Sequence, residues 1–363
     1  MKKLLFVWSG LKIGGSERAL LTLVKYLIKD YIVEILCHQH ICEYTVLPDV
    51  KINYIKTPRV KFLNKLSDKV YLWQAIYKHA SNVDVVICNE FPLLAIFSYC
   101  AAKLQRKPLI IWNHSCRGEL RLTNNLMVEK VYKYVLKNAH SIVNVSSYSE
   151  RSLFNYVACE PSNSQVIYNI VDVISPSLPR TIPHQKAKYS IVAIGGLIRE
   201  KNFSLLIYAA EVLIKEHHMD LEIIICGDGI EKNNLLELIN TLDLNAHVKL
   251  VGKVNNPLDY IQASDLLVSP SNSESFSLVV CEALLLNKPV IVTDTGAAEV
   301  VANGKYGIVI EKNNREQLIA AILTIVREPL LIQAKLEQYA EALSRFDAVK
   351  QIIPKWNRLF TAL

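Results

Sequence analysis

Two carboxylates eight positions apart, Glu274 and Glu282, are the residues whose chemistry and spacing stand out in this sequence. A carboxylate accepts two hydrogen bonds side by side, which matches the hydroxyl pairs of sugars. Between the two glutamates the chain changes from turn residues to a helical pattern. A helix N-terminus presents backbone N–H groups and positive potential to a phosphate. The combination is typical of a site that binds a sugar nucleotide.

The elements that must position these carboxylates follow from the local pattern. Ser269–Asn272 has turn composition, and the apolar residues between Leu278 and Leu286 recur at helical spacing. The pattern predicts a helix that starts near Ser277, with Ser275 or Ser277 as its N-cap. A buried strand is expected to follow at Pro289–Val292. One glutamate then lies in the loop before the helix, and the other lies on its second turn.

The spacing alone also fits two solvated glutamates on a surface helix, so the surrounding residues decide. Pro270-Ser271 precedes the helix, Asn287–Asp294 follows it, and Gly227-Asp228-Gly229 lies upstream. Together they resemble the donor half of the family 4 glycosyltransferases. The resemblance implies the α/β GT-B fold, in which two Rossmann-like domains with parallel sheets face each other across a cleft. It also implies a retaining glycosyltransferase that uses a sugar nucleotide and needs neither a metal nor another cofactor.

The resemblance implies a role for each residue of this segment. Glu274 is expected to be catalytic, holding the sugar hydroxyls and orienting the ring, and Glu282 is expected to hold the ribose hydroxyls. The donor diphosphate is expected against Ser275, Phe276, Ser277 and Leu278. The family usually has Glu-Gly-Phe-Gly where this chain has serines at 275 and 277. Serine still presents its backbone N–H group, but it restricts φ where glycine does not.

A second loop is expected to supply cations to the diphosphate. After the apolar run Ser190–Ile194 the chain reads Gly195 to Asn202, where the family has an arginine and a lysine for the two phosphates. Lys201 matches the lysine, whereas Gly196 occupies the arginine position. Arg199 lies two residues before the lysine and is a candidate for the missing charge. The alternative for this stretch is a solvated turn.

The first half of the chain opens with a strand, a glycine loop and an amphipathic helix, as Rossmann domains do. Gly14-Gly15-Ser16-Glu17 forms the loop, although the dinucleotide fingerprint Gly-x-Gly-x-x-Gly is absent. It resembles the family loop that contacts donor phosphate and acceptor, so Gly15 is expected at the donor. His114 follows the strand Leu109–Trp112 and matches a family histidine that reaches the donor sugar or its phosphates. The alternatives are an ordinary glycine turn and a histidine satisfied within its own domain.

The alternation of strands and helices predicts two parallel sheets. We expect an acceptor-binding domain at 1–172, a proline-containing linker at 173–188 and a nucleotide-sugar domain at 189–345. The final segment, 346–363, has helical spacing, and in the family such a helix returns to the first domain. The expected strands are Leu4–Trp8, Ile32–Cys37, Val83–Cys88, Leu109–Trp112, Ile142–Ser146, Ser190–Ile194, Leu221–Cys226, His247–Val251, Leu266–Ser269 and Val290–Thr293.

The composition limits the class of protein, its compartment and the segments that could cross a membrane. The chain has 363 residues with 51% hydrophobic and 21% charged side chains, which is typical of a folded protein of about two domains. Eight cysteines occur without a Cys-x-x-Cys pair, and those in apolar runs, such as Cys88, Cys226 and Cys281, read as buried thiols. This favours a reducing cytoplasm and no metal cage. The short apolar run at Leu4–Trp8 favours a first strand over a signal peptide. No apolar run is long enough to span a bilayer.

The charge is uneven. Residues 1–172 hold 22 Lys and Arg against 13 Asp and Glu, or +9, and the remainder holds 19 against 21, or −2. Within the basic half, Arg59–Lys78 predicts a helix with one stripe of Leu63, Leu66, Val70, Trp73 and Tyr77 and another of Lys61, Lys65 and Lys69. Such a helix suits an anionic membrane surface. The alternative is a helix that packs its apolar stripe on its own domain and exposes the lysines.

The family resemblance implies a hexosyltransferase-type enzyme (EC 2.4) that builds bacterial surface polysaccharide or lipopolysaccharide, and the missing targeting signals favour the cytoplasm. It is expected at the inner face of the cytoplasmic membrane as a peripheral protein. Its partners would be a nucleotide-sugar donor and a glycan or lipid-linked acceptor, and no nucleic acid. The alternatives are a sugar-nucleotide epimerase of the same fold and a catalytically inactive glycosyltransferase-like binding subunit. A pyridoxal-phosphate-dependent glycan phosphorylase also shares the fold, but such chains are far longer.

Overall fold

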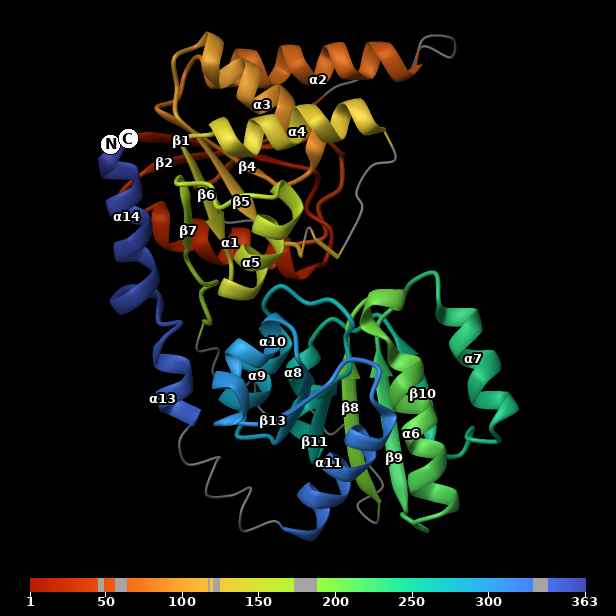
Figure 1. The fold of residues 1–363 in the computed structure, drawn as a ribbon. Coiled ribbons are helices and arrows are strands. Elements are labelled where there is room, and N and C mark those ends of the chain that lie inside the picture. Colours follow the sequence, from red (N-terminus) through yellow and green to blue (C-terminus); the bar gives the residue numbers. More distant parts are fainter. Residues whose placement is uncertain (45–48, 56–63, 117, 120–124, 173–187, 329–338) are drawn as a thin grey trace. The chain divides into compact units, whose positions relative to one another are not determined.

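A computed structural model describes the chain except for residues 45–48, 56–63, 117, 120–124, 173–187 and 329–338 (Figure 1). The chain forms two compact units. The first comprises Met1–Ile170 together with Phe346–Leu363, and the second comprises Val171–Arg345. Most of the stretch that we expected to be a linker, 173–188, lies outside the described residues.

The first unit is built on a seven-stranded sheet in the order β3-β2-β1-β4-β5-β6-β7, in which every neighbouring pair is parallel. Its central strands are almost wholly buried, because they are apolar runs covered by helices on both faces. The strands are β1 (Lys3–Trp8), β2 (Ile32–Cys37), β3 (Lys51–Tyr54), β4 (Val85–Asn89), β5 (Leu109–Asn113), β6 (Ser141–Asn144) and β7 (Ser164–Val166).

Helices cover both faces of this sheet. Four of them bury their apolar sides against one face: α2 (Asn64–Ala80), α3 (Pro92–Leu104), α4 (Leu126–Asn138) and α5 (Ser147–Val157). Ile111 of β5 faces this core, so the next residue, Trp112, faces the other side. There it packs edge-on against Trp356 of the C-terminal helix α14 (Ile353–Ala362), which also contacts α1 (Gly15–Leu27).

The C-terminal segment is fastened to the first unit by polar contacts as well. Lys2 Nζ donates to the Phe360 carbonyl at 2.6 Å, and the Tyr31 hydroxyl donates to Asn357 Oδ1 at 3.1 Å. The segment starts as a π-helical turn, η3 (Ala348–Ile352), and continues as α14 with a proline in its first turn. Proline is tolerated there because the first N–H groups of a helix have no partner within the helix.

The second unit has a six-stranded parallel sheet in the order β10-β9-β8-β11-β12-β13. Its strands are β8 (Tyr189–Ile194), β9 (Leu221–Cys226), β10 (Val248–Gly252), β11 (Leu266–Ser269), β12 (Val290–Thr293) and β13 (Ile308–Ile310). Its helices are η1 (Arg199–Lys201), α6 (Phe203–Lys215), α7 (Lys232–Thr241), α8 (Pro257–Ala263), α9 (Leu278–Leu285), α10 (Gly296–Val300), η2 (Ala302–Gly304), α11 (Arg315–Arg327) and α13 (Tyr339–Ser344). The predicted α/β class with two parallel, Rossmann-like sheets is confirmed.

Three strands escaped prediction. β3, β7 and β13 have three or four residues each, and most of their side chains are only half-buried. β3 and β7 contain polar residues, and the apolar run of β13 is only three residues long, so none of the three has the longer apolar run that marked the central strands. Cys88, Cys226 and Cys281 are buried free thiols, as predicted.

Two interpretations were open for the apolar stripe of the helix near Arg59–Lys78, a membrane-facing stripe and a stripe packed on its own domain, and the described residues do not fit the second. α2 buries Leu72, Ile76 and Ala80, whereas Val70 and Tyr77 of the predicted stripe are 47% and 36% exposed. The start of the predicted helix, including Lys61 and Leu63, lies outside the described residues, as do the side chains of Lys65 and Leu66. None of the described helices is both long and apolar enough to cross a membrane.

Candidate functional site

In the second unit, the predicted site residues lie where the strand order reverses. β8 pairs with β9 on one side and with β11 on the other, and the loops that follow β8 and β11 leave the sheet in different directions. Open parallel sheets bind ligands in the crevice at this point, beyond the carboxyl ends of the strands. η1 lies in the loop after β8, and Glu274 lies in the loop after β11.

Lys201 and Glu274 form an ion pair that joins these two loops. Lys201 Nζ donates to Glu274 Oε2, and the two side chains are 24% and 16% exposed. Gly195 leaves room for the lysine, because a Cβ built there would lie 3.3 Å from Lys201 Cδ and Cε. The structure thus brings together the lysine predicted for the phosphates and the glutamate predicted for the sugar.

Backbone contacts hold the loop of Glu274 in place. Asn272 N–H donates to the Glu200 carbonyl at 2.7 Å, and Gly296 N–H donates to the Glu274 carbonyl at 2.8 Å. A Cβ on Gly296 would lie only 2.2 Å from the Ser275 carbonyl oxygen, so this close approach requires glycine. The carboxylate is therefore carried by a loop that is fastened on two sides.

The start of α9 differs from the prediction in one respect. Ser277 occupies the N-cap position, but its side chain makes no capping hydrogen bond, and its φ of 129° lies in the region that favours glycine. This conformation explains why the family pattern has glycine there. Phe276, 2% exposed, anchors the turn in the core, and Ser275 and Leu278 flank it half-buried.

Glu282 lies on the second turn of α9, as predicted, and is 3% exposed. Arg199 lies apart from the lysine–glutamate pair: its side chain is 86% exposed, and its Nε lies 3.4 Å from Glu231 Oε1.

His114 and Gly15 belong to the first unit. His114 follows β5, with its ring centroid 5.7 Å from that of Trp8 and 4.4 Å from that of Trp112. Burial lowers the pKa of the His114 imidazole to about 3, so the ring is neutral near pH 7. Gly15 is the first residue of α1 and is exposed, and a Cβ there would meet nothing within 4 Å.

Two carboxylates near these residues escaped prediction as site residues. Glu17 accepts a hydrogen bond from Ser16 Oγ at 2.9 Å, and Glu90 follows β4 and is 7% exposed. Burial raises the pKa of the Glu17 carboxyl, and the charge of Glu90 raises it further. β1 and β4 flank the point where this sheet's order reverses. The signal was present in the sequence, because Asn89-Glu90 directly follows an apolar strand.

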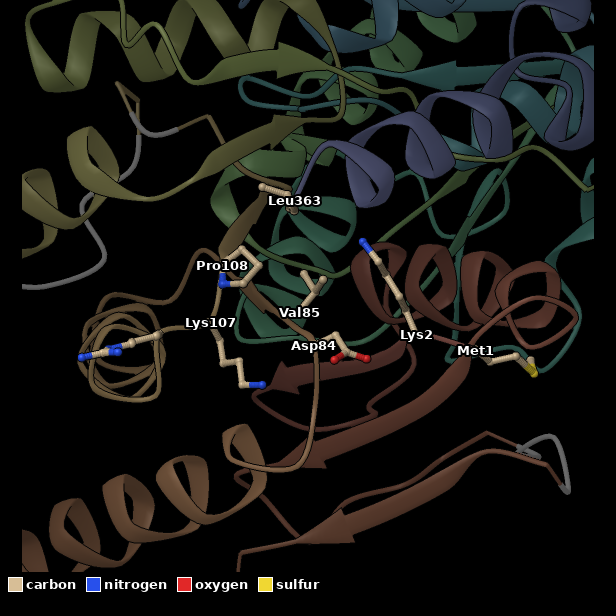
Figure 2. Close-up of a pocket in the computed structure, with 8 residues that line it drawn as sticks. Met1, Lys2, Asp84, Val85, Lys107, Pro108 and Leu363 are labelled. Carbon is tan, nitrogen blue, oxygen red and sulfur yellow. The ribbon is translucent and has the colours of Figure 1, made fainter.

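A cavity of about 480 Å³ lies in the first unit, at the opposite ends of the strands from Gly15 and His114, and Figure 2 shows the residues that line it. It is lined at the amino ends of β1, β4 and β5, and it contains none of the predicted site residues. The residues that line it are Met1, Lys2, Asp84, Val85, Arg106, Lys107, Pro108 and Leu363. In parallel sheets the ligand end is the carboxyl end, so we do not assign the donor or the acceptor to this cavity.

Known proteins resemble the whole chain. The relative from Campylobacter jejuni named N-acetylgalactosamine-N,N'-diacetylbacillosaminyl-diphospho-undecaprenol 4-alpha-N-acetylgalactosaminyltransferase is 25% identical over 96% of this chain and 97% of its own. The poly(ribitol-phosphate) alpha-N-acetylglucosaminyltransferase of Staphylococcus aureus is 24% identical over 85% of this chain and 61% of its own.

Solved structures share the fold. Anabaena HepE in complex with UDP-glucose superposes with a TM-score of 0.81 at 21% identity, covering 100% of both chains. Sucrose-phosphate synthase from Thermosynechococcus elongatus superposes with a TM-score of 0.83 at 15% identity, again covering 100% of both chains.

Two family descriptions match this chain, one for each half. Residues 13–174 match Glycosyltransferase Family 4, and residues 176–343 match Glycosyl transferases group 1. The chain belongs to the family 4 glycosyltransferases of the GT-B fold, and it is a hexosyltransferase-type enzyme.

Proposed function

We propose that this enzyme is a retaining glycosyltransferase that moves a hexose or N-acetylhexosamine from a UDP-sugar to a lipid-linked or polymeric glycan of the bacterial surface. The observation that carries the proposal is the ion pair between Lys201 and Glu274 at the reversal point of the second sheet. The named activities of the relatives, an undecaprenol-linked sugar transfer and a ribitol-phosphate glycosylation, support the acceptor class. The UDP-glucose complex of HepE supports the donor class.

The charge of the leaving group explains the role of Lys201 in the loop after β8. When the anomeric bond breaks, negative charge develops on the departing diphosphate and positive charge develops on the sugar ring. Lys201 and the N-terminus of α9 stabilise the negative charge. The carboxylate of Glu274, released from Lys201 as the diphosphate takes its place, accepts hydrogen bonds from the sugar hydroxyls. The ion pair is thus exchanged for two contacts with the donor.

Retention follows if the acceptor attacks the face from which the diphosphate leaves. The departing phosphate then takes the proton of the acceptor hydroxyl, and no side-chain nucleophile is needed. His114, neutral at pH 7, donates one N–H hydrogen bond to a sugar hydroxyl or a phosphate oxygen without adding a charge. Glu282 holds the ribose, and Gly15 and the backbone of residues 275–278 approach the diphosphate. In this scheme Lys201 and the helix end supply the neutralisation that a metal ion supplies in other enzymes, so a chelator should leave turnover unchanged.

Donor identity and stereochemistry provide the first test. A thermal-shift screen of UDP-, GDP- and ADP-sugars should stabilise the protein most with a UDP-sugar, because a ligand at 100 times its dissociation constant adds about 2.7 kcal/mol. The product formed from an α-linked donor should show an α linkage by NMR. A β-linked product would contradict retention. An isomerised donor in the absence of acceptor would indicate an epimerase, and intact donor after prolonged incubation with acceptor would indicate an inactive binding subunit.

Two substitutions separate the roles of the ion pair. Lys201→Ala should weaken UDP binding by about tenfold or more and leave uridine binding nearly unchanged, because the charge faces phosphates. Glu274→Gln should lower turnover far more than UDP binding, because its partner is the sugar. Lys249→Ala removes a similar ion pair, with Glu222, and is the matched control. Equal losses for UDP and uridine would show that Lys201 acts through folding.

A further inference from the structure

Three helices of the first unit, α2, α3 and α4, form a layer on which exposed large apolar side chains are concentrated. α3 lies between α2 and α4 and contacts both (Figure 1). All three helices face the core with one side, through buried residues such as Leu72, Leu94 and Tyr132. We call the side of α2, α3 and α4 that faces away from the sheet the outer helical face.

Exposed apolar side chains concentrate on these helices. Among the described residues, 19 large apolar side chains are exposed, and nine of them lie within α2, α3 and α4, which have 17, 13 and 13 residues. A monomeric soluble protein normally scatters such residues singly. The nine are Val70, Tyr71, Tyr77, Leu93, Leu104, Leu126, Met127, Val131 and Tyr134.

The charges on the same helices have one sign. Within their bounds the sequence has seven lysines against two acidic residues, Asp68 and Glu129, which gives +5. Both acidic residues are half-buried. The exposed lysines are Lys69, Lys78, Lys103, Lys130 and Lys137.

Aromatic rings lie against one another and under a lysine on these helices. Trp73 and Tyr77 stack with centroids 5.3 Å apart on α2. Tyr99 of α3 meets Tyr134 of α4 edge-on at 6.1 Å, and Lys103 Nζ lies 5.6 Å above the Tyr99 ring. Rings with one polar edge, long lysine stems and projecting Leu and Met side chains are the chemistry of the membrane–water interface.

We propose that the outer helical face docks the enzyme on an anionic phospholipid bilayer. Protein–protein interfaces are depleted of lysine, whereas a negatively charged lipid surface attracts each exposed lysine at little geometric cost. α2 buries Leu72, Ile76 and Ala80 and leaves Val70 and Tyr77 exposed, which argues against the alternative that the predicted apolar stripe packs on its own domain. The inference rests on the proposed function to the extent that a lipid-carried acceptor requires the enzyme at a membrane.

Vesicle flotation tests the proposal. The protein should float with vesicles of phosphatidylglycerol and phosphatidylcholine at low salt, float less as salt is raised, and stay with the soluble fraction in phosphatidylcholine alone. The Lys69/Lys130/Lys137→Glu variant should bind at least about a hundredfold more weakly, because each lysine near an anionic surface contributes to attraction. The Lys25/Lys29/Lys232→Glu variant changes the net charge equally at exposed positions elsewhere and should bind nearly as the wild type does.

A reporter on α3 tests which face meets the lipid. Cys100 is exposed on α3, and Cys42 is exposed in the loop after β2. An environment-sensitive fluorophore should shift to the blue on vesicle addition at Cys100 and not at Cys42, with the other exposed cysteines replaced by serine. Absence of flotation at low salt, or equal losses in the two lysine variants, would overturn the proposal. UDP-sugar binding, measured on the same proteins, reports on the proposed function separately.

Discussion

His114 shows how burial sets the charge of one side chain and links it to stability. Its folded pKa is about 3, below the usual value of 6.5. Between these values the unfolded chain binds a proton that the folded chain does not, so stability falls as pH falls from about 6.5 toward 3. Over this range, the His114 imidazole changes the free energy of unfolding by up to about 1.4 kcal/mol per pH unit.

The His114→Asn variant should therefore lose part of the acid sensitivity. Urea unfolding measured between pH 7 and pH 4 should give a shallower dependence of unfolding free energy on pH than in the wild type. His217→Asn, at an exposed position, is the control and should leave the slope unchanged. An unaltered slope in the His114 variant would show that its imidazole is solvated.

Ser277 is the residue where the chain departs from its family at a conformational cost. Its φ of 129° is strained for any residue with a Cβ, and such strain is of order 1–3 kcal/mol. Ser277→Gly should stabilise the second unit by about 1 kcal/mol and raise its Tm by about 2–4 °C in calorimetry. Ser275→Gly, outside the residues with positive φ, is the matched control and should give no gain. Equal effects of the two glycines would contradict the strain argument.

At the scale of one element, the loop after β8 contains the second departure from the family pattern, where Gly196 occupies the position of an arginine. A Cβ there would approach nothing closer than the Asp228 carbonyl oxygen at 3.9 Å, and the residue does not have a positive φ. The loop therefore has room for a side chain at position 196.

The Gly196→Arg variant should strengthen UDP binding by about tenfold, since a hydrogen bond to a charged group contributes roughly 1.5–3 kcal/mol. Uridine binding should stay the same. Gly196→Ala, compared by isothermal titration, separates the guanidinium from the loss of glycine flexibility. A gain for uridine as large as that for UDP would mean that the loop, rather than the charge, had changed.

Elements differ in how well the sequence predicts them. Four strands were predicted with the bounds observed, because each is a mainly apolar run, interrupted by at most one glutamate: Ile32–Cys37, Leu221–Cys226, Leu266–Ser269 and Val290–Thr293. The core-facing residues Leu72 and Ile76 of α2 lie outside the predicted apolar stripe, because two apolar stripes share that helix and only the positions of α3 and the sheet decide which one is buried. Contacts between distant residues, such as Lys201 with Glu274, follow from the sheet order rather than from any local pattern.

At the scale of the whole molecule, the C-terminal segment belongs to the unit in which the chain began. Trp356 is 1% exposed and contacts both Trp112 and Phe360. Trp356→Ala should therefore destabilise the first unit by about 3–5 kcal/mol and leave the second unaffected. Hydrogen exchange should show lost protection in β1 and β5 and native protection in β8 and β11. Val349→Ala, at a 68% exposed position of the same segment, is the control, and protection lost evenly over both units would contradict the assignment.

Because residues 346–363 pack on the first unit, they also affect the order in which the two units can complete their folding during translation. The strands of the first unit emerge first, but the surface around Trp112 stays uncovered until the 175 residues Val171–Arg345 have been translated. At about 5–20 residues per second that interval is roughly 10–35 s. The second unit is one continuous stretch of chain, so it can complete its sheet before the first. A nascent chain of this enzyme therefore presents an apolar patch to chaperones over these 175 residues, about half of the 363, until residues 346–363 cover it.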